Sequence, residues 1–341
     1  DPAGAREYAK KVYRAYFAEG RDVGEPAIAL ELAGDLGIDT AALAEALKGE
    51  AIKERLKGEV EAAMKAGVFG SPYFIVDGEE IFLGSQNFDW RALKHIHEVG
   101  VHIKNKDIVK IYKDIFDLDW KLAERNDPTV IQESVIRKHY QLPIFLGGHD
   151  NESISLFPTV SPKVLCFDST MWDEDWIVHL IDEAKNDLYC QFLTYSPIAR
   201  GKIFYLTLDN ALRRAAIRGV KVRMIVSDWS IDHPTIDHLK SLSLIPNIQI
   251  KFSSIPQWSA GYIPFARVEH CKFLVIDSTS CWIGTSNWEK SYFYNCRNLG
   301  IVVKDRSIAK QLRGIFNRSW DGPYTTLIKS EVEYTPRKHG E

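Results

Sequence analysis

The first part of the chain carries its hydrophobic residues at helical spacing. Apolar positions recur every three or four residues in segments 5–20, 25–37 and 39–67, and each segment stops at a glycine. Asp39 begins the third segment, where a short carboxylate can accept hydrogen bonds from the free amides of a first helical turn. The pattern therefore predicts helices as far as about residue 66.

A different pattern begins after Gly70. Short runs of β-branched and aromatic residues replace the helical spacing, and the Asp77-Gly78 turn predicts a hairpin within 73–84. After residue 165, helical and strand-like runs alternate, which predicts an α/β fold. The expected helices are 173–186 and 202–219, and the expected strands are 188–195, 220–228 and 248–255.

Between these parts, residues 126–164 lack any sustained period. The segment contains four prolines and a Gly-Gly pair, which interrupt helices and strands. We therefore interpret 126–164 as a connector.

The chain repeats itself at a constant offset of 200 residues. Residues 73–77 align with 273–277 in an apolar run that ends in aspartate, and the alignment continues without a gap to Trp120 and Trp320. Other identical pairs are Gly84 with Gly284, Asn87 with Asn287, Gly100 with Gly300, and Lys104 with Lys304. Shared glycine, asparagine, lysine and tryptophan positions indicate an internal duplication rather than a generic pattern of strands and helices. The similarity ends upstream of residue 73.

Composition narrows the classes of function. The 341 residues carry a formal net charge of −3, so no global field recruits nucleic acid or an anionic membrane, and an anionic substrate needs a local cluster of cations. The 5 cysteines all lie beyond residue 165 and form no Cys-x-x-Cys pair, so we expect no metal site. No apolar run approaches the roughly 20 residues that span a bilayer, and we expect the chain as given to be soluble.

The second copy carries a cluster of reactive residues. His270, Lys272 and Asp277 have the spacing His-x-Lys-x-x-x-x-Asp, and Thr285 and Asn287 follow at the end of the next predicted strand. Alternate residues of a strand share a face, so the imidazole and the ammonium should emerge side by side. A neutral imidazole can attack phosphorus, while a lysine and an amide hold the oxygens on which negative charge develops. The cluster predicts phosphodiester chemistry without a cofactor.

This motif resembles the signature of the phospholipase D superfamily. Residues 73–327 look most similar to the branch that contains endolysosomal 5′→3′ exonucleases and their poxviral relatives. The resemblance implies an α/β fold in which two motifs face each other across a pseudo-twofold axis, and a location in the endolysosomal or secretory lumen. By the resemblance His270 is the nucleophile, Lys272, Thr285 and Asn287 bind phosphate, and Asp277 supports them or is chiefly a turn residue.

The first copy departs from the signature. The offset places Gly70 opposite His270 and Pro72 opposite Lys272, so this half-site lacks the nucleophile and the phosphate-binding lysine. Its remaining candidates are Ser85 and Asn87 for phosphate binding, Asp77, and Glu98, which stands where related half-sites carry an acid that orients the histidine. A homodimer that pairs two His270 side chains is one way to complete the site.

The front of the chain has a resemblance of its own. Residues 6–90 are similar to the helical region and closing hairpin of 2-hydroxychromene-2-carboxylate isomerases and kappa glutathione transferases, which are DsbA-like thioredoxin relatives. Pro72 after Ser71 stands where that group has a cis-proline at its thiol-binding site. The βαβ unit that carries the catalytic residues of that group has no counterpart in this sequence. We interpret the chain as a chimera whose two parts meet inside one hairpin.

Together these patterns predict five segments. They are a helical cap (1–69), a truncated first phospholipase D-like half-lobe (70–125), the connector (126–164), a complete second lobe (165–330) and a tail (331–341). The expected activity is hydrolysis of single-stranded nucleic acid or another phosphodiester through a phosphohistidine, impaired by the missing first motif. Two alternatives stay open. One is a catalytically inactive pseudoenzyme that binds nucleic acid or phosphate, and the other is a glutathione-dependent isomerase- or transferase-like protein whose activity comes from the N-terminal part. Trp288, Tyr292 and Phe293 are either base-stacking residues or core aromatics.

Overall fold

The computed structural model describes residues 2–17, 21, 23, 25–50, 52, 54, 55, 58, 73–87, 89–125, 139–147, 153–199 and 203–337. Contacts divide the chain into two compact units, Asp1–Phe69 and Gly70–Glu341. The predicted roles of Gly70, Ser71 and Pro72 concern positions outside the described residues.

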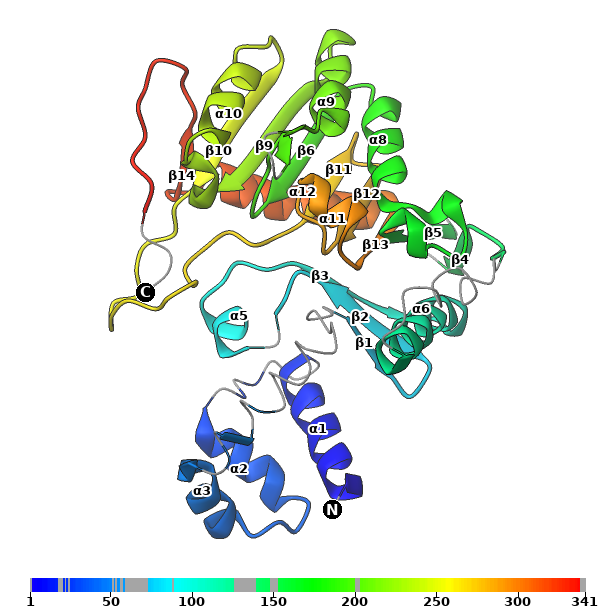
Figure 1. Ribbon diagram of the computed structural model, residues 1–341, viewed down its shortest axis with the longest axis vertical. Coiled ribbons are helices and arrows are strands. Elements are labelled where there is room, and N and C mark those ends of the chain that lie inside the picture. The colour runs from blue at the N-terminus through cyan, green and yellow to red at the C-terminus, as the bar shows by residue number, and fades with distance from the viewer. Residues whose placement is uncertain are drawn as a thin grey trace. The chain divides into compact units, whose positions relative to one another are not determined.

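The first unit is helical, as the spacing of its apolar residues predicts. Its labelled helices are α1 (Pro2–Phe17), α2 (Pro26–Gly34) and α3 (Thr40–Lys48) (Figure 1). Asp39 caps α3, because its carboxylate accepts hydrogen bonds from the amides of Ala41 and Ala42, both at 3.0 Å. The Tyr8 hydroxyl donates to the Ala29 carbonyl at 3.0 Å and so ties α1 to α2.

The second unit is built on a nine-stranded mixed sheet in the order β14-β10-β9-β6-β11-β12-β13-β5-β4. From β4 onward the strands are β4 (Ile144–Gly147), β5 (Ser153–Ser161), β6 (Asp187–Phe192), β9 (Lys221–Ser227), β10 (Ile248–Ser253), β11 (Phe273–Ile276), β12 (Ser280–Gly284), β13 (Asn298–Lys304) and β14 (Thr325–Leu327). A separate two-stranded sheet joins β7 (Ile198–Ala199) to β8 (Ile203–Phe204).

Helices cover both faces of this sheet. The α-helices of this part are α8 (Asp173–Glu183), α9 (Thr207–Ile217), α10 (Thr235–Ser243), α11 (Lys290–Tyr294) and α12 (Arg306–Trp320). Figure 1 shows α8, α9 and α10 on one side of the sheet and α12 on the other. Phe316 of α12 packs against Tyr189 of β6 with ring centroids 5.2 Å apart, whereas Asp173 of α8 accepts a hydrogen bond from the Trp282 indole on the opposite face. The predicted α/β architecture is confirmed.

A small three-stranded sheet precedes the large one. It consists of β1 (Tyr73–Val76), β2 (Glu80–Gly84) and β3 (Gly100–Lys104), with helices α5 (Trp90–Lys94) and α6 (Lys106–Arg125). The Tyr112 hydroxyl of α6 donates to the carbonyl of Gly300 in β13 at 2.6 Å, and this bond is buried. Arg297 also donates two hydrogen bonds to Asp119 of α6, from Nε and Nη2 of its guanidinium. The small sheet is therefore fastened to the second lobe.

The internal duplication is confirmed by the strand registers. Tyr73 lies opposite Leu83 in the first hairpin, and Phe273 lies opposite Ile283 in the second. The third strands repeat the match, because Gly84 pairs with Gly100 and Gly284 with Gly300. Even the turns agree, since Asp77 and Asp277 both have φ of 50°. Residues 200 positions apart in the sequence therefore occupy equivalent positions in the two hairpins and their third strands.

Two sequence predictions are corrected here. The connector predicted for 126–164 contains β4 and β5, and β5 pairs along its length with β13. The prediction missed β5 because it contains Pro158, which has no backbone N–H. The pairing of β5 with β4 ends at Leu156, so at Pro158 the strand has only β13 as a neighbour. A proline is tolerated at such a position because it leaves no ladder partner unsatisfied. The helix predicted for 202–219 begins at Thr207, after the short strand β8.

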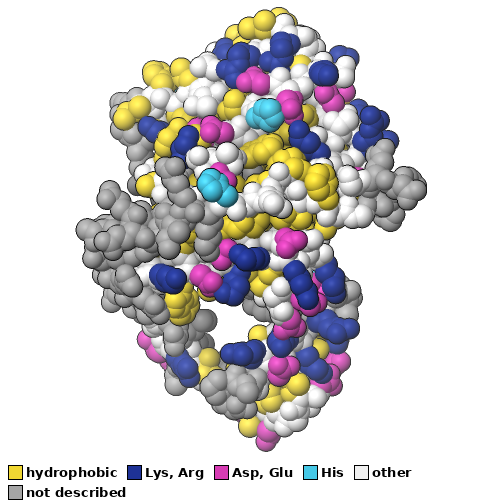
Figure 2. Space-filling view, turned by 90° about the vertical axis from the view of Figure 1, so that its right-hand side faces the viewer, with side chains coloured by type: hydrophobic (Ala, Val, Ile, Leu, Met, Phe, Trp, Pro, Cys, Tyr) yellow, Lys and Arg dark blue, Asp and Glu magenta, His cyan; other side chains and the backbone are white. Residues whose placement is uncertain are grey.

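The predicted tail also has packing of its own. Tyr334 lies over Phe252 of β10 with ring centroids 5.3 Å apart, and Glu333 pairs with Lys240 of α10 at 2.9 Å. Among the described residues, no helix is long and apolar enough to cross a membrane. On the face shown in Figure 2, acidic and basic side chains are interspersed, in keeping with the small net charge of −3.

Candidate functional site

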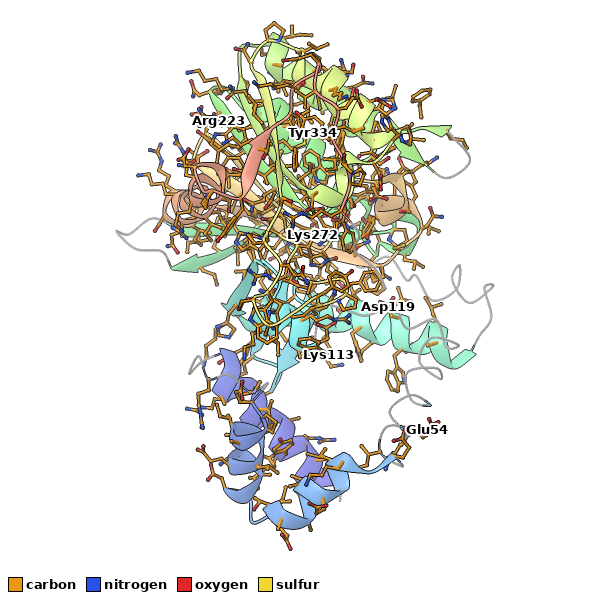
Figure 3. All side chains as sticks on the ribbon, turned by 90° about the vertical axis from the view of Figure 1, so that its left-hand side faces the viewer. Glu54, Lys113, Asp119, Arg223, Lys272 and Tyr334 are labelled. Carbon is orange, nitrogen blue, oxygen red and sulfur yellow. The ribbon has the colours of Figure 1, made fainter. Side chains whose placement is uncertain are left out.

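The reactive residues of the second copy gather where the two sheets meet. His270 and Lys272 directly precede β11, and Thr285 and Asn287 directly follow β12, its hairpin partner. The amide of Gly284 bonds the carbonyl of Lys272 at 3.1 Å, so the hairpin ladder continues to the lysine. Figure 3 places Lys272 at the boundary between the large sheet and the strands of the small one.

An acid from the first copy holds His270. The Nδ1 atom of His270 lies 2.9 Å from Oε2 of Glu98, and the same oxygen accepts a 2.5 Å bond from the Ser85 hydroxyl. A carboxylate at Nδ1 favours the tautomer with its proton on that nitrogen, which leaves the lone pair on Nε2 for chemistry. Burial and the charge of Lys272 lower the pKa of His270 below its usual value, against the raising effect of Glu98. The imidazole is therefore neutral at pH 7.

Lys272 is a buried cation beside this imidazole. Its side chain is 3% exposed, and its Nζ donates to the carbonyl of His270 at 2.9 Å. Burial lowers the pKa of Lys272 to about 8, although nearby acidic groups oppose the shift. Most of the lysine is thus protonated at pH 7, in a dry setting where one positive charge acts strongly on an oxyanion.

Thr285 and Asn287 are buried at the end of β12. The Thr285 hydroxyl donates to Oδ1 of Asn298 at 2.8 Å and accepts the amide of Leu299. Oδ1 of Asn287 lies 3.5 Å from the Thr194 amide, a long contact, and the Asn287 side chain also bonds Tyr292. Thr285 is thus placed by bonds within the second copy, whereas Asn287 also contacts Thr194, which follows β6.

A second acid–histidine pair crosses between the same segments. Nδ1 of His97 lies 2.8 Å from Oε2 of Glu269, and the amide of His270 donates to the carbonyl of His97 at 2.9 Å. Each segment therefore contributes one histidine and one acid, at neighbouring positions whose side chains point to opposite faces. Neither His97 nor Glu269 is evident as a site residue from the sequence, because nothing in the local pattern brings residues 172 positions apart together.

The charges of this second pair reinforce each other. Burial alone would lower the pKa of His97, but the hydrogen bond and charge of Glu269, with the charge of Glu98, raise it above the usual value. Burial opposes ionisation of Glu269, yet its bond to His97 keeps the pKa of that carboxyl below the usual value. Gln191 and the amide of Cys271 supply further donors to Glu269, at 2.8 and 3.1 Å.

The described residues include one group with the donor types of a metal site. Ligand-type atoms of His97, Glu269 and Cys271 all lie within 4.8 Å of one another. Both carboxylate oxygens of Glu269 already accept hydrogen bonds. Burial raises the pKa of the Cys271 thiol, and the negative charge of Glu269 raises it further. Because zinc-type metals bind the thiolate, this donor set does not fit one. The expectation of no metal site stays a prediction.

Two of the three candidate stacking residues are core aromatics instead. Trp288 and Phe293 are both 0% exposed, and Trp288 packs on Phe192 with ring centroids 4.3 Å apart. Phe293 lies beside Tyr205 with ring centroids 6.3 Å apart, and with these neighbours neither ring can meet a base. Tyr292 is half-buried. Tyr262 and Phe265, which precede the motif, are exposed.

Asp277 acts as a turn residue. Its carboxylate accepts the amides of Lys185, Asn186 and Asp187 at 2.8–3.0 Å, so it fastens the hairpin turn to the start of β6. It lies at the far end of β11 from Lys272, about 16 Å away at some 3.3 Å per residue. These contacts favour the turn role of Asp277 over a supporting role at the site.

The first copy contributes unevenly to the site. Ser85 and Glu98 are brought to His270, although Ser85 is committed to Glu98 and Val99 rather than open to a phosphate. Asn87 is exposed, and Asp77 occupies the hairpin turn at the other end of β1. Glu98 is thus the residue through which the first copy acts on the second.

Comparisons with known proteins agree with this geometry. A family model described as "PLD3/4, PLD-like domain" matches residues 24–255. The chain is 30% identical over 295 residues to the mouse 5′-3′ exonuclease PLD4, covering 79% of this chain and 58% of that protein. It is 31% identical over 271 residues to phospholipase D Z of Dictyostelium discoideum, covering 76% of this chain and 64% of that protein. The chain therefore spans about three fifths of the length of these relatives.

A solved structure shares the fold. Phosphatidylserine synthase from Haemophilus influenzae superposes with a TM-score of 0.53 over 77% of this chain and 64% of that one, at 11% sequence identity. The motif spacing, the duplicated hairpins and the match to the family model lead to one assignment. The chain belongs to the phospholipase D superfamily.

Proposed function

We propose that this protein hydrolyses phosphodiesters through His270, with single-stranded nucleic acid as the substrate class. The observation that carries the proposal is a neutral imidazole whose Nδ1 is held by Glu98 and whose neighbour is the buried cation of Lys272. The relatives named as 5′-3′ exonucleases favour nucleic acid over phospholipid as the substrate.

The proposed reaction has two displacements at phosphorus. Nε2 of His270 attacks, a phosphorus–nitrogen bond forms, and the bond from phosphorus to the leaving oxygen breaks. The leaving oxygen takes a proton from a general acid. Water then attacks the phosphohistidine, the phosphorus–nitrogen bond breaks, and the proton of the water returns to that acid. Lys272 and Asn287 stabilise the charge on the non-bridging oxygens throughout.

The general acid is the weak part of this mechanism. The offset of 200 puts Gly70 where a second histidine would stand, so the first copy supplies no acid from its motif. We expect turnover to be slow, since a positioned acid typically contributes about 10²–10⁴-fold. A homodimer would supply the second His270, and in that case activity per molecule should rise with protein concentration.

The test is cleavage of a 5′-hydroxyl single-stranded oligonucleotide by the purified protein. His270→Ala should abolish turnover, and wild-type protein quenched in alkaline denaturant, in which a phosphorus–nitrogen bond survives, should carry a nucleotidyl phosphate adduct on His270 by mass spectrometry. His102→Ala is the matched control, because His102 is exposed and pairs with Glu80 outside the site. Turnover that survives in His270→Ala would refute the proposal.

A second variant tests the missing acid directly. Gly70→His combined with Pro72→Lys restores both motif residues of the first copy, and we expect a gain of about 10²-fold or more. The competing function is a pseudoenzyme that binds single-stranded nucleic acid without cleaving it. The loss of Trp288 and Phe293 as stacking surfaces speaks against strong base binding at this site. Retained binding with no adduct and no turnover in either form would establish the pseudoenzyme.

A further inference from the structure

A cavity lies on the face of the second lobe opposite to His270. Its volume is about 350 Å³, and it is lined by His97 and Glu269, by residues of α12, and by the chain segments at the ends of β10 and β14. Glu269 and His270 are consecutive, so their side chains point to opposite faces of the segment. The cavity is therefore separate from His270 and Lys272, neither of which lines it.

Arg318 and His97 both line this cavity. His97 is hydrogen-bonded to Glu269, and Arg318 lies close enough for its charge to act on the imidazole. Arg318 is exposed on α12, and among the described residues it forms no ion pair. The acid in the cavity, Glu269, is 1% exposed and already bound to His97, Gln191 and the Cys271 amide. One guanidinium is thus left without a counter-charge beside an imidazole.

The rest of the lining is apolar with hydroxyl groups at its edge. Ile255, Ile315 and Pro323 form the walls, and the ring of Tyr324 is 48% exposed. Ser253 and Thr325 add side-chain oxygens. A cavity of this size is at the lower end of those that take small organic ligands, about 300–1,000 Å³. Its size, its apolar walls and the guanidinium of Arg318 suit a planar ring that carries a single anionic group.

We propose that this cavity binds a small aromatic oxyanion, with its phosphate or carboxylate on Arg318 and His97 and its ring between Tyr324 and the isoleucines. A guanidinium binds either anionic group through two parallel hydrogen bonds. The ligand needs both the anionic group and the ring. An anion without a ring makes no contact with the apolar walls, and a neutral ring leaves the guanidinium unpaired.

The binding test uses His270→Ala protein, so that its result does not depend on hydrolysis. Thymidine 3′-monophosphate and benzoate are titrated by calorimetry, with inorganic phosphate and thymidine as partial ligands. We expect saturable binding of one or both ring-bearing anions, and at least tenfold weaker binding of phosphate alone and of thymidine alone. Thymidine monophosphate binding more tightly would assign a phosphate ligand, and benzoate a carboxylate ligand.

Variants locate the binding in the cavity. Arg318→Gln should weaken both ring-bearing anions at least tenfold, whereas Lys310→Gln, an exposed position on the same helix outside the cavity, should leave them unchanged. Tyr324→Ala should weaken the ring-bearing anions but not inorganic phosphate. Equal melting temperatures for the three variants would show that each is folded. No saturable binding of either anion, or binding that Arg318→Gln leaves intact, would overturn the proposal.

Discussion

The two copies of the duplicated unit share their registers but differ in what covers them. Phe316 and Trp320 of α12 are 0% and 7% exposed, whereas their counterparts Phe116 and Trp120 of α6 are 46% and 58% exposed. In the second copy, Tyr189 of β6 packs on Phe316, and Lys251 of β10 lies over the ring of Trp320 at 4.7 Å. The hairpin and helix thus follow from their own sequence, while their burial is supplied by strands from elsewhere in the lobe.

The two copies also contribute different residues to the site. Glu98 of the first copy and Asn298 of the second occupy equivalent positions. Glu98 accepts a hydrogen bond from the Ser85 hydroxyl, and Asn298 accepts one from the Thr285 hydroxyl. Only the acid lies against a histidine, and that histidine belongs to the other copy. Equivalent positions in a duplicated unit can therefore serve one site unequally.

The largest expected effect tests the difference in burial. Phe316→Ala should lower the free energy of unfolding by about 3–5 kcal/mol, because it leaves a cavity against Tyr189. Phe116→Ala removes an exposed ring and should change stability by about 0.5 kcal/mol or less. Urea unfolding of both variants measures the contrast, and similar losses would mean that the ring of Phe116 is covered in solution.

The next largest effect tests the unequal roles of Glu98 and Asn298. Glu98→Gln should lower turnover about 10²-fold, because a neutral amide holds the imidazole without the negative charge that stabilises it as it gains a proton. It should also lower the pKa of His270 further, which proton NMR of the imidazole can follow. Asn298→Asp is the matched change in the other copy and should leave the pKa of His270 where it was. An unchanged rate in Glu98→Gln would remove Glu98 from the mechanism.

The anchor at the second turn should have a smaller effect. Asp277→Ala removes the acceptor of three backbone amides and should cost about 1–3 kcal/mol of unfolding free energy. Asp77→Ala places alanine at the same φ of 50° in the first copy, so the backbone strain cancels in the comparison. Thermal unfolding of the pair compares the anchor of Asp277 with the interactions that Asp77 makes in the first copy, and equal losses would show that the three amide bonds add nothing beyond these.

The pH dependence of turnover is the smallest of the expected effects. His270 must be neutral to attack, and its lowered pKa means that the rate reaches its plateau below the usual histidine range as pH rises. Lys272 must be protonated, so the rate should fall again as pH rises through about 8. A bell-shaped plot of kcat/KM against pH is expected. A plateau that continues beyond pH 10 would mean that Lys272 is not needed as a cation.

Much of this arrangement could be predicted from residues close in sequence. The offset of 200 fixed which residues pair in the two hairpins, and the alternation along β11 placed His270 beside Lys272. The cap at Asp39 was equally local. Each of these depends on neighbours within a strand, a turn or a helical turn, which a sequence displays directly.

What escaped prediction depends on contacts between distant segments. Whether Trp288 stacks on a base or fills the core is decided by Phe192 of β6, and the spacing around Trp288 contains no trace of that ring. The strand β5 was hidden by Pro158, whose tolerance follows only from where β4 ends. The pairing of His97 with Glu269 needs the two segments to be side by side, which no local period encodes.

The crossed pairing of the two segments has a consequence for the order of folding. Each hairpin closes over about ten residues, but the bonds from His270 to Glu98 and from His97 to Glu269 both span 172 positions. Loop-closure entropy makes such distant contacts slow to form. We therefore expect the proposed nucleophile to be oriented only in the last steps of folding, after both sheets exist, so that a partly folded chain carries an unoriented and unreactive histidine.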